Sequence, residues 1–388
     1  MANEVRVAGI GMTPMDTRDL GVEELAVAAV SEALADAGVS SREIGFVVVG
    51  NALGGRLVEQ GCIRGEVWLR SLEFDNAGVS NVDNSCAGGS TAMHLGVSAA
   101  LAGQSPVLVV GVEKMWAGNR EQTMAGIEDG LPADEREIRR ANLDNPAGSV
   151  LMGMNAAWVN LQIEERGTTI EQIAATTVKA RKCGMLNPLA QFRSPVTVDE
   201  VLASRTVAGP LTRLMCSSFT DGAAACVLTT ELRAGAPRVR ASVLRSGNGG
   251  LDYHQRLAGT AEEAWKAAGI GPEDVDVTEL HDATSAEELY ALESLGFFPS
   301  GEAGIATLAG ATEPGGKGVC VNPSGGLVAR GHPLGATGVS QIVELVLQLR
   351  GSAGTRQVPR ARVGVAVNTG GLINADAASA AVHVLEKT

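Results

Sequence analysis

The strongest constraint on the fold is an internal repeat. The segment ADAGVSSREIGFVVVGNA, from Ala35, is similar to KAAGIGPEDVDVTELHDA, from Lys266. Each segment is typical of a helix that ends at a glycine, followed by a short polar turn and a strand. The alignment pairs Gly38 with Gly269, 231 residues further along the chain. Two similar structural units are the simplest explanation of such a repeat.

A second correspondence follows the first. In both halves a turn with a polar, reactive residue opens a helix of small residues: SCAGGSTAMHLGVSAALAG from Ser85 and GHPLGATGVSQIVELVLQLRG from Gly331. Strand-like segments then follow, VLVVGVE from Val107 and RVGVAVN from Arg362. The sequence therefore predicts an α/β protein with two duplicated units packed together, in which helices cover mixed sheets.

The segment between the two halves has a different pattern. From about 116 to 203 it becomes charged and irregular (GIEDGLPADEREIRRANLDNP), with Met and Trp residues nearby. We interpret it as an inserted loop domain, and a plain surface excursion is the alternative. The expected domains are a first half at 1–117 and 204–235, the loop domain at 118–203, and a second half at 236–388. Apolar residues in SVLMGMNAAWVNLQ, from Ser149, suggest that this segment shapes a ligand tunnel or a dimer contact.

Composition excludes several functions. The 388 residues carry a net charge of -13, and no Lys/Arg run suits a phosphate backbone, so nucleic acid is not an expected partner. The chain shows no leader-like start and no apolar run long enough to insert into a membrane, so we expect a cytoplasmic protein. Its six cysteines lack CxxC pairs and histidines at zinc spacing. Neither a metal site nor a disulfide framework is expected.

Cys86 is the candidate nucleophile. It follows a short strand-like segment and comes just before a helix whose first residues are all small. The free N–H groups at a helix N-terminus favour a thiolate, and small neighbours let an acyl group approach the backbone. The backbone N–H of Cys86 is a candidate oxyanion donor. On its own, however, the pattern is more typical of a buried structural thiol.

Two histidines are candidate partners of the thiol. His332 lies in NPSGGLVARGHPLGATG, where glycines and prolines fix a turn before a helix and would hold a base in place. His281 ends the strand-like VDVTELHDATS, where the first half has Gly50. It could donate a hydrogen bond to a thioester oxygen or simply cap the next helix. A lone histidine in a turn is more often an ordinary polar residue.

A glycine pair near the C-terminus completes the candidate site. Gly370 and Gly371, in VAVNTGGLINADA, are expected to follow a buried strand and to leave backbone N–H groups open to a ligand. A simple tight turn is the alternative interpretation. Asn322 and Ser324, in the NPSGG segment, are further candidate substrate-binding residues.

Taken together, NSCAGGS, ELHDATS, NPSGGLVARGHPLGATG and VNTGG resemble the motifs of the thiolase superfamily, most closely the sterol-carrier-protein type. Four motifs in the same order are far more specific than any one, and the resemblance spans residues 5–385. GVEKM, NPLAQF and CSSFTDGAAA add to it. The resemblance implies the thiolase fold: two βαβαβ-type halves in an α/β/α/β/α arrangement, with an inserted loop domain.

The resemblance also implies roles for the candidate residues. Cys86 would accept an acyl group from a coenzyme A thioester, and His332 would activate the thiol. His281 would polarise the second thioester oxygen with a bound water or His332, and the backbone N–H groups of Cys86 and Gly370 would form the other oxyanion hole. The chemistry would be ping-pong Claisen condensation or thiolytic cleavage. Coenzyme A would be a co-substrate, with no permanently bound cofactor.

The chain departs from the family pattern at one catalytic position. Thiolases usually use a second cysteine as acid and base, either in a C-terminal CxG motif or just after the HD of the sterol-carrier branch. Asn368 and Ala283 occupy these two positions. Cys320 is a candidate replacement by its nearness in sequence, although its place on an apolar strand predicts burial.

Three functions follow from these observations. A thiolase-type acyltransferase that acts on a 3-oxoacyl-CoA is the first, and retention of Cys86 and His332 favours it. The second is a C-acyltransferase or retro-aldolase that works with a zinc-ribbon/OB-fold accessory protein. The third is a non-catalytic subunit that binds acyl-CoA. The resemblance further implies a homodimer or a larger assembly, with the sheet edge near Cys86 at the contact.

Overall fold

The protein is described by a computed structural model that covers residues 4–116, 119–143 and 148–388. Its first half contains five strands, in the spatial order β1-β7-β4-β2-β3. β2 pairs in parallel with β3 and β4, whereas β7 pairs antiparallel with β4 and β1. The strands are β1 (Arg6–Met12), β2 (Phe46–Gly50), β3 (Gly78–Val82), β4 (Val107–Glu113) and β7 (Gly222–Thr229).

The second half repeats this arrangement. Its strands run in the order β8-β12-β11-β9-β10, with the same alternation of parallel and antiparallel pairs. A single pair, Arg6 with Arg238, joins β1 to β8 and links the two halves into a ten-stranded sheet. The strands are β8 (Arg238–Ser246), β9 (Val277–Glu279), β10 (Cys320–Val321), β11 (Val363–Ile373) and β12 (Asp376–Glu386).

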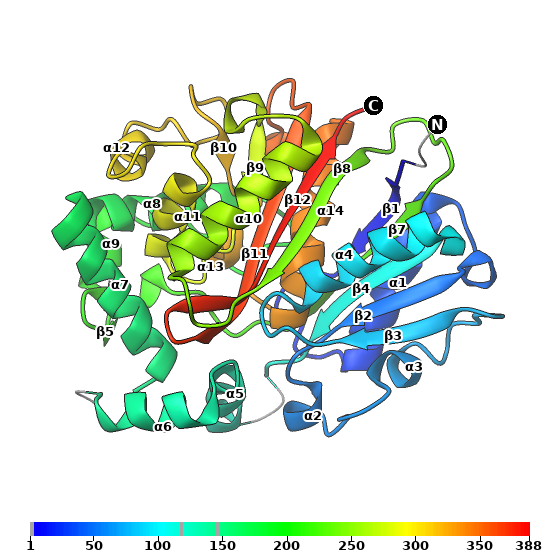
Figure 1. The fold of residues 1–388 in the computed structure, drawn as a ribbon, viewed down its shortest axis with the longest axis horizontal. Coiled ribbons are helices and arrows are strands. Elements are labelled where there is room, and N and C mark those ends of the chain that lie inside the picture. The colour runs from blue at the N-terminus through cyan, green and yellow to red at the C-terminus, as the bar shows by residue number, and fades with distance from the viewer. Residues whose placement is uncertain (1–3, 117–118, 144–147) are drawn as a thin grey trace.

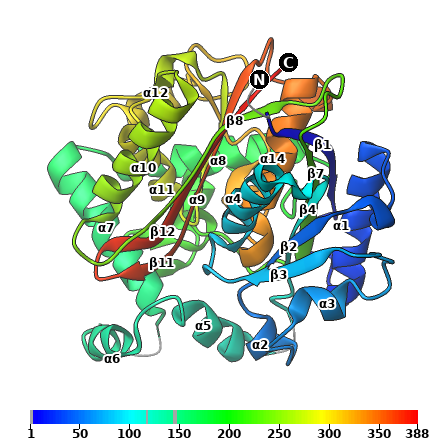
Figure 2. The same cartoon turned by 45° about the vertical axis from the view of Figure 1, so that its right-hand side comes forward.

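Two helices lie side by side between the halves: α4 (Gly88–Ala99) and α14 (Leu334–Arg350) (Figures 1 and 2). Both contact strands of the first and the second half. Small residues make this close packing feasible, because a Cβ atom on Gly338 would lie 2.3 Å from the backbone nitrogen of Ser90. Outside the sheets, α1 (Val22–Ala37) covers β1, β7 and β4, and α10 (Tyr253–Ala268) covers β8 and β12. The predicted duplicated α/β fold with alternating layers is confirmed.

The repeat extends to the details of the backbone. Gly38 and Gly269 end α1 and α10 in the left-handed conformation, with φ of 64° and 65°. A short 3₁₀ helix follows at equivalent positions, Ser41–Glu43 and Pro272–Asp274. Glycine adopts positive φ without the steric cost of a side chain, so the shared glycine stop marks the same helix end in both halves.

The segment that we interpreted as an irregular loop domain is largely helical in its described part. Its helices lie together on one side of the molecule, in teal and green in Figure 1. They are α5 (Arg120–Glu128), α6 (Ala133–Ala141), α7 (Val150–Arg166), α8 (Ile170–Leu186) and α9 (Val198–Ala203). The boundary expected at 117/118 lies outside the described residues, and the division into domains stays a prediction.

The remaining elements are short apart from α11, and they connect the larger ones. They are α2 (Gly54–Leu57), α3 (Arg64–Trp68), α11 (Ser285–Ser294), α12 (Ala303–Leu308), α13 (Gly326–Ala329) and the small sheet of β5 (Thr206–Ala208) and β6 (Leu211–Thr212). Across the residues that the structure describes, every helix is too short or too polar to cross a bilayer.

Candidate active site

Cys86 lies in the turn between β3 and α4, two residues before the helix begins at Gly88. Ser85, the residue before it, has a positive φ of 50°, which is uncommon for a residue with a side chain. Backbone strain of this kind is found preferentially at functional sites, where the surrounding structure holds it in place. The thiol is half-buried, and Cys86 lies at the N-terminal, positive end of α4.

His332 occupies the equivalent turn of the second half. It lies two residues before α14 begins at Leu334, just as Cys86 precedes α4 by two residues. The turn depends on Gly331, whose φ is 114°. The backbone N–H of His332 donates to the Thr220 hydroxyl at 3.0 Å, which fixes the turn against the first half. The pseudo-symmetry of the fold thus brings the thiol and an imidazole to the ends of two neighbouring helices.

The hydrogen bonds around His332 determine its tautomer. Its Nδ1 atom lies 2.7 Å from the Thr337 hydroxyl, which also contacts the carbonyl oxygen of Pro333 at 2.9 Å. A threonine hydroxyl has one proton, and the Pro333 carbonyl can only accept. The hydroxyl therefore donates to Pro333 and accepts from Nδ1–H of His332. Nε2 of the neutral ring is left as the proton acceptor.

His281 follows β9 and is buried. Its Nδ1 atom lies 3.0 Å from the Thr369 hydroxyl and 3.5 Å from a carboxylate oxygen of Glu287. Its Nε2 atom is buried and has no hydrogen-bond partner among the described residues. A buried N–H without a partner is costly unless a substrate or an intermediate satisfies it. The orientation of His281 therefore suits a donor to a developing oxyanion.

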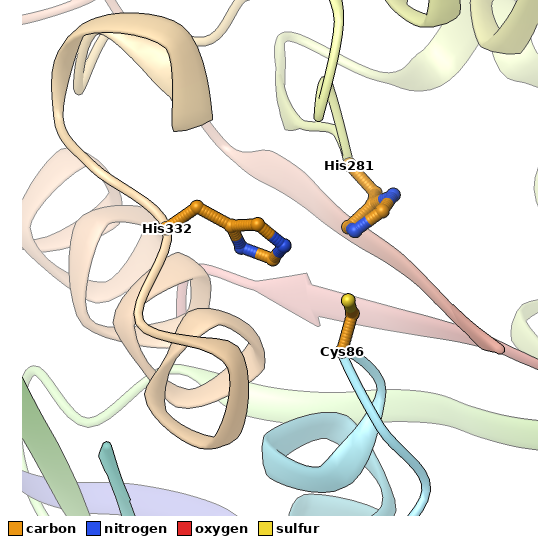
Figure 3. Close-up of side chains that lie close together, drawn as sticks. All are labelled: Cys86, His281 and His332. Carbon is orange, nitrogen blue, oxygen red and sulfur yellow. The ribbon is translucent and has the colours of Figure 1, made fainter. Parts of the chain in front are cut away.

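The three side chains point toward one another (Figure 3). The Cys86 sulfur and one ring nitrogen of each histidine all lie within 4.8 Å of one another. Among the described residues, this is the one group of Cys, His, Asp and Glu side chains close enough to hold a metal ion. A thiol beside a neutral imidazole is also the donor set that nucleophilic acyl transfer requires.

The two histidines have opposite charge preferences. Burial alone would lower the pKa of His281, but the neighbouring Cys86 sulfur and Glu287 carboxylate raise it to about 10. Burial lowers the pKa of His332 well below its ordinary value, and the positive charges of His281 and Arg330 lower it further. At neutral pH His281 is therefore a cationic donor and His332 a neutral base. Such divergent values distinguish acid from base in a catalytic pair.

A layer of buried polar groups supports the histidine segment. Asn322 and Ser324, which we predicted as candidate substrate-binding residues, are fully buried and do not line the pocket. Asn322 accepts the backbone N–H of Leu280 at 2.7 Å, and the Ser324 hydroxyl donates to Glu279 at 2.6 Å. Both residues therefore hold the strand end that carries His281.

The glycine pair occupies a different local structure from the expected one. Gly370 and Gly371 lie within β11, which continues to Ile373, rather than after the strand. A Cβ atom on Gly370 would lie 2.4 Å from the backbone nitrogen of Ala87, so only glycine lets the strand approach the turn that carries Cys86. Both glycines line the pocket. The longer strand forms because β12 pairs with β11 as far as Ile373.

The two positions at which thiolases usually carry a second cysteine differ in their access to the pocket. Ala283 lines the pocket, whereas Asn368 is fully buried and does not line it. Cys320, the candidate replacement, is buried on β10 away from the pocket, and burial raises its pKa well above the ordinary value. Another cysteine, Cys216, does line the pocket. Burial raises its pKa to about 12, and its sulfur contacts the Thr212 carbonyl.

Sequence reasoning missed Glu287. This buried residue lies on α11, one helical turn after Ala283, and its Oε2 atom accepts the Ala283 N–H at 3.1 Å. Its Oε1 atom has no hydrogen-bond partner within the described part of the chain. The sequence signal that could have identified it is its place in the first turn of the helix after His281, where acidic residues are favoured.

The three side chains open onto a pocket of about 1090 Å³. One wall comes from the helical insertion and includes Met124, Met152 and Trp158. The adjoining wall comes from the second half and includes Tyr253, whose ring lies 5.3 Å from that of Trp158 and whose hydroxyl lies 3.0 Å from the Thr369 hydroxyl. Large, mostly apolar cavities with a few convergent polar groups are typical of small-molecule sites.

Comparison with known proteins agrees with this geometry. The thiolase N-terminal domain matches residues 5–232, and the thiolase C-terminal domain-like family matches residues 252–387. An acetyl-CoA acetyltransferase of Methanothermobacter thermautotrophicus is 35% identical, with 99% of this chain and 100% of the relative covered. Sterol carrier protein 2 of Bos taurus is 35% identical over 95% of this chain and 70% of its own length.

Two further similarities complete the comparison. The benzoylsuccinyl-CoA thiolase subunit BbsB of Thauera aromatica is 33% identical, with 96% of each chain covered. The solved structure described as "Ltp2-ChsH2(DUF35) aldolase" has a TM-score of 0.81 at 21% identity, and the match covers 99% of this chain and 98% of that one. The second match supports the fold alone. With family matches along nearly its whole length, the chain belongs to the thiolase family and is a thiolase-like acyltransferase.

Proposed function

We propose that this enzyme catalyses the CoA-dependent cleavage of a 3-oxoacyl-CoA, or the reverse Claisen condensation, through an acyl thioester on Cys86. The observation that carries the proposal is the convergence of the Cys86 sulfur with a ring nitrogen of His281 and of His332 within 4.8 Å. This arrangement combines a nucleophile, a neutral base and a cationic hydrogen-bond donor at the edge of one pocket.

In the first half-reaction, His332 accepts the thiol proton of Cys86 on Nε2 as the sulfur attacks the thioester carbonyl. The oxyanion that forms receives hydrogen bonds from preorganised donors, and loss of one such donor typically costs about 10²–10³ in rate. The carbon–sulfur bond to coenzyme A then breaks. The departing thiolate takes the proton from His332, which leaves acyl-Cys86 and a neutral imidazole.

In the second half-reaction of condensation, a second acyl-CoA loses a proton from its α-carbon. Glu287 is the proposed base that accepts this proton. Its Oε1 atom is free, and its Oε2 atom lies 3.5 Å from His281 Nδ1. The cationic His281 stabilises the enolate oxygen through Nε2–H. The enolate carbon attacks the acyl carbonyl and the bond to Cys86 breaks. The departing thiolate takes up the proton held by Glu287, which restores the Cys86 thiol and the Glu287 carboxylate. Thiolytic cleavage runs through the same steps in reverse.

The experiment that tests the acyl intermediate is intact-protein mass spectrometry after brief exposure to acetyl-, butyryl-, succinyl- and benzoyl-CoA. We expect one acyl group on the native protein and none on Cys86→Ala. Cys216→Ala is the matched control, because Cys216 is the other thiol in the pocket, and it should still be acylated. Acylation lost in Cys216→Ala instead, or absent with every thioester, would overturn the proposal.

Two alternative functions make different experimental predictions. A partner-dependent C-acyltransferase or retro-aldolase is favoured by one observation, the fold similarity to a structure whose description names an aldolase together with a DUF35 component. A reaction that appears only when a zinc-ribbon/OB-fold protein is added would support it. A non-catalytic subunit that binds acyl-CoA would bind the thioesters without acylation of Cys86.

We also propose a cytoplasmic homodimer. β3 is an edge strand of the sheet, and it leads directly into the turn that carries Cys86. An edge strand presents unpaired backbone groups and is a natural surface for pairing with a second copy. Light scattering during size-exclusion chromatography should give twice the mass of one chain. A monomer at micromolar concentration would contradict the proposed dimer.

A further inference from the structure

One buried arginine in the pocket has no counter-ion. Arg181 lies on α8, and only 7% of its surface is exposed. Its guanidinium makes no ion pair or hydrogen bond with any residue that the structure describes, and its Nε atom is fully buried. It stacks on the ring of Phe192, with 4.4 Å between the guanidinium carbon and the ring centroid. Stacking holds the guanidinium flat and leaves its terminal nitrogens unpaired.

Two more arginines lie beside Arg181. Arg205 and Arg213 flank the small β5–β6 sheet, and the Arg213 N–H donates to the Arg205 carbonyl at 2.8 Å. Both side chains are exposed and line the pocket, and neither forms an ion pair with a described residue. Burial lowers the pKa of Arg181, and the charge of Arg213 lowers it further, so the two charges are close in space. Three guanidinium groups without a described counter-ion therefore line the same pocket.

Other buried arginines of the protein form ion pairs with buried carboxylates. Arg330 contacts Glu279 at 3.0 Å, and Arg356 contacts Glu344 at 2.9 Å. A buried charge without a partner costs several kcal/mol in general, so a folded protein retains one where a ligand can compensate it. The contrast is sharper because the whole chain carries a net charge of -13, which makes carboxylates abundant.

The cluster belongs to the cavity that holds Cys86 and both histidines. Phe192, under the Arg181 guanidinium, donates its backbone N–H to the Ala329 carbonyl, three residues before His332. On the other side, Arg213 precedes Cys216 by three residues, and the next residue, Ser217, donates to the Ala283 carbonyl. The cavity that holds Cys86 therefore also holds these positive charges.

We propose that Arg181, with Arg205 and Arg213, forms an anion subsite for the thioester substrate. The subsite takes a carboxylate at the far end of the acyl chain. A carboxylate is a planar oxyanion that guanidinium groups bind through charge-assisted, bidentate hydrogen bonds. This inference rests on the proposed function in one respect only, namely that the ligand is a thioester.

The test separates the two sources of negative charge. Calorimetry would measure the binding of butyryl-CoA, succinyl-CoA, butyryl-pantetheine and succinyl-pantetheine to Cys86→Ala protein, which removes turnover from the measurement. Each ligand would then be compared with the double variant Cys86→Ala/Arg181→Met. The matched control is Arg193→Met in the same background, because Arg193 is exposed and does not line the pocket.

We expect Arg181→Met to weaken binding at least tenfold, the order expected for one charge-assisted interaction, and Arg193→Met to leave it unchanged. A loss confined to succinyl thioesters supports the acyl-carboxylate subsite, and a loss confined to CoA thioesters overturns it, because Arg181 would then contact a phosphate of the coenzyme. An equal loss for all four ligands, including uncharged butyryl-pantetheine, or no loss for any of them, overturns the proposal. Failure of Cys86 acylation in the wild type would contradict the proposed chemistry separately.

Discussion

The rings of His281 and His332 lie edge to face, with centroids 5.2 Å apart, yet the two imidazoles favour opposite charge states. Their environments explain the difference. His281 has the Glu287 carboxylate and the Cys86 sulfur as neighbours, whereas His332 is buried beside two positive charges, His281 and Arg330. Protonation of one ring therefore disfavours protonation of the other, and the pair keeps one acid and one base at neutral pH.

The rates of Cys86 acylation and of condensation should depend on pH in a way set by this pair. His332 must be neutral to accept the thiol proton, so the acid limb should lie well below pH 6.5. His281 must be protonated to stabilise the enolate, so the alkaline limb of the complete condensation should lie near pH 10. Stopped-flow release of coenzyme A measures the acid limb, and the steady-state rate of condensation measures the alkaline limb. A limb near pH 7, the value of an unperturbed histidine, would contradict the assignment.

The same shift affects stability. Because the pKa of His281 is raised in the folded state, its ion pair stabilises the fold fully below pH 6.5, and that stabilisation is lost as the pH rises through about 10. Replacement of His281 by Gln should therefore flatten this part of the stability profile. Urea unfolding at several pH values measures the effect, and an identical alkaline loss of stability in wild type and variant would contradict it.

Thr337→Val should slow acylation about tenfold, because His332 loses the acceptor that keeps its proton on Nδ1. Valine has the shape of threonine without the hydroxyl, so packing changes little. Thr337→Ser is the matched control and should restore the rate. The acid limb of the pH profile should move in the valine variant alone, which a purely structural defect would not produce.

Glu287→Gln should separate the two half-reactions. Removal of the carboxylate takes away the proposed base, so exchange of the α-protons of acetyl-CoA with deuterium should fall at least a hundredfold, the ~10²–10⁴ range of general base catalysis. Acylation of Cys86 should fall much less at pH 7. Glu121→Gln, at an exposed residue that also lines the pocket, should leave exchange unchanged. If exchange is unchanged in Glu287→Gln, Glu287 is not the base and another group removes the α-proton.

Arg330→Met should destabilise the fold by about 3–5 kcal/mol at pH 7, because it leaves the buried Glu279 without its partner. Burial raises the pKa of Glu279 to about 7, and Arg330 opposes this shift. The loss should shrink at acidic pH, since protonated Glu279 needs no counter-charge. Urea unfolding at pH 5 and pH 8 measures both effects. Arg362→Met, at an exposed residue, serves as the control.

Local sequence determined much of this protein. Glycines that stop helices, small residues at the starts of α4 and α14, and apolar strands are local signals, and they sufficed to predict the duplicated α/β fold. The same signals led to Cys86 and His332, because a reactive residue in a fixed turn before a small-residue helix is visible without any long-range contact. His281 was found through its difference from Gly50 in the other half.

Other features depend on contacts between distant segments, and only the tertiary structure decided them. The side chains of Asn322 and Ser324 are buried because they form hydrogen bonds with Leu280 and Glu279. Gly370 joined a longer strand because β12 was there to pair with it. A sequence pattern gives the period of an element but not the partner that it meets, so the direction of these side chains could not be predicted.

The charge states of the site were likewise decided by the fold. The sequence named the two histidines but could not distinguish the acid from the base, because the distinction rests on burial and on neighbours such as Glu287 and Arg330. Arg181 gave no sequence signal at all, since an arginine on a helix is usually solvated. Sequence therefore determined which reactive groups are present, and tertiary packing determined their protonation and their partners, because desolvation and Coulomb interactions act through space rather than along the chain.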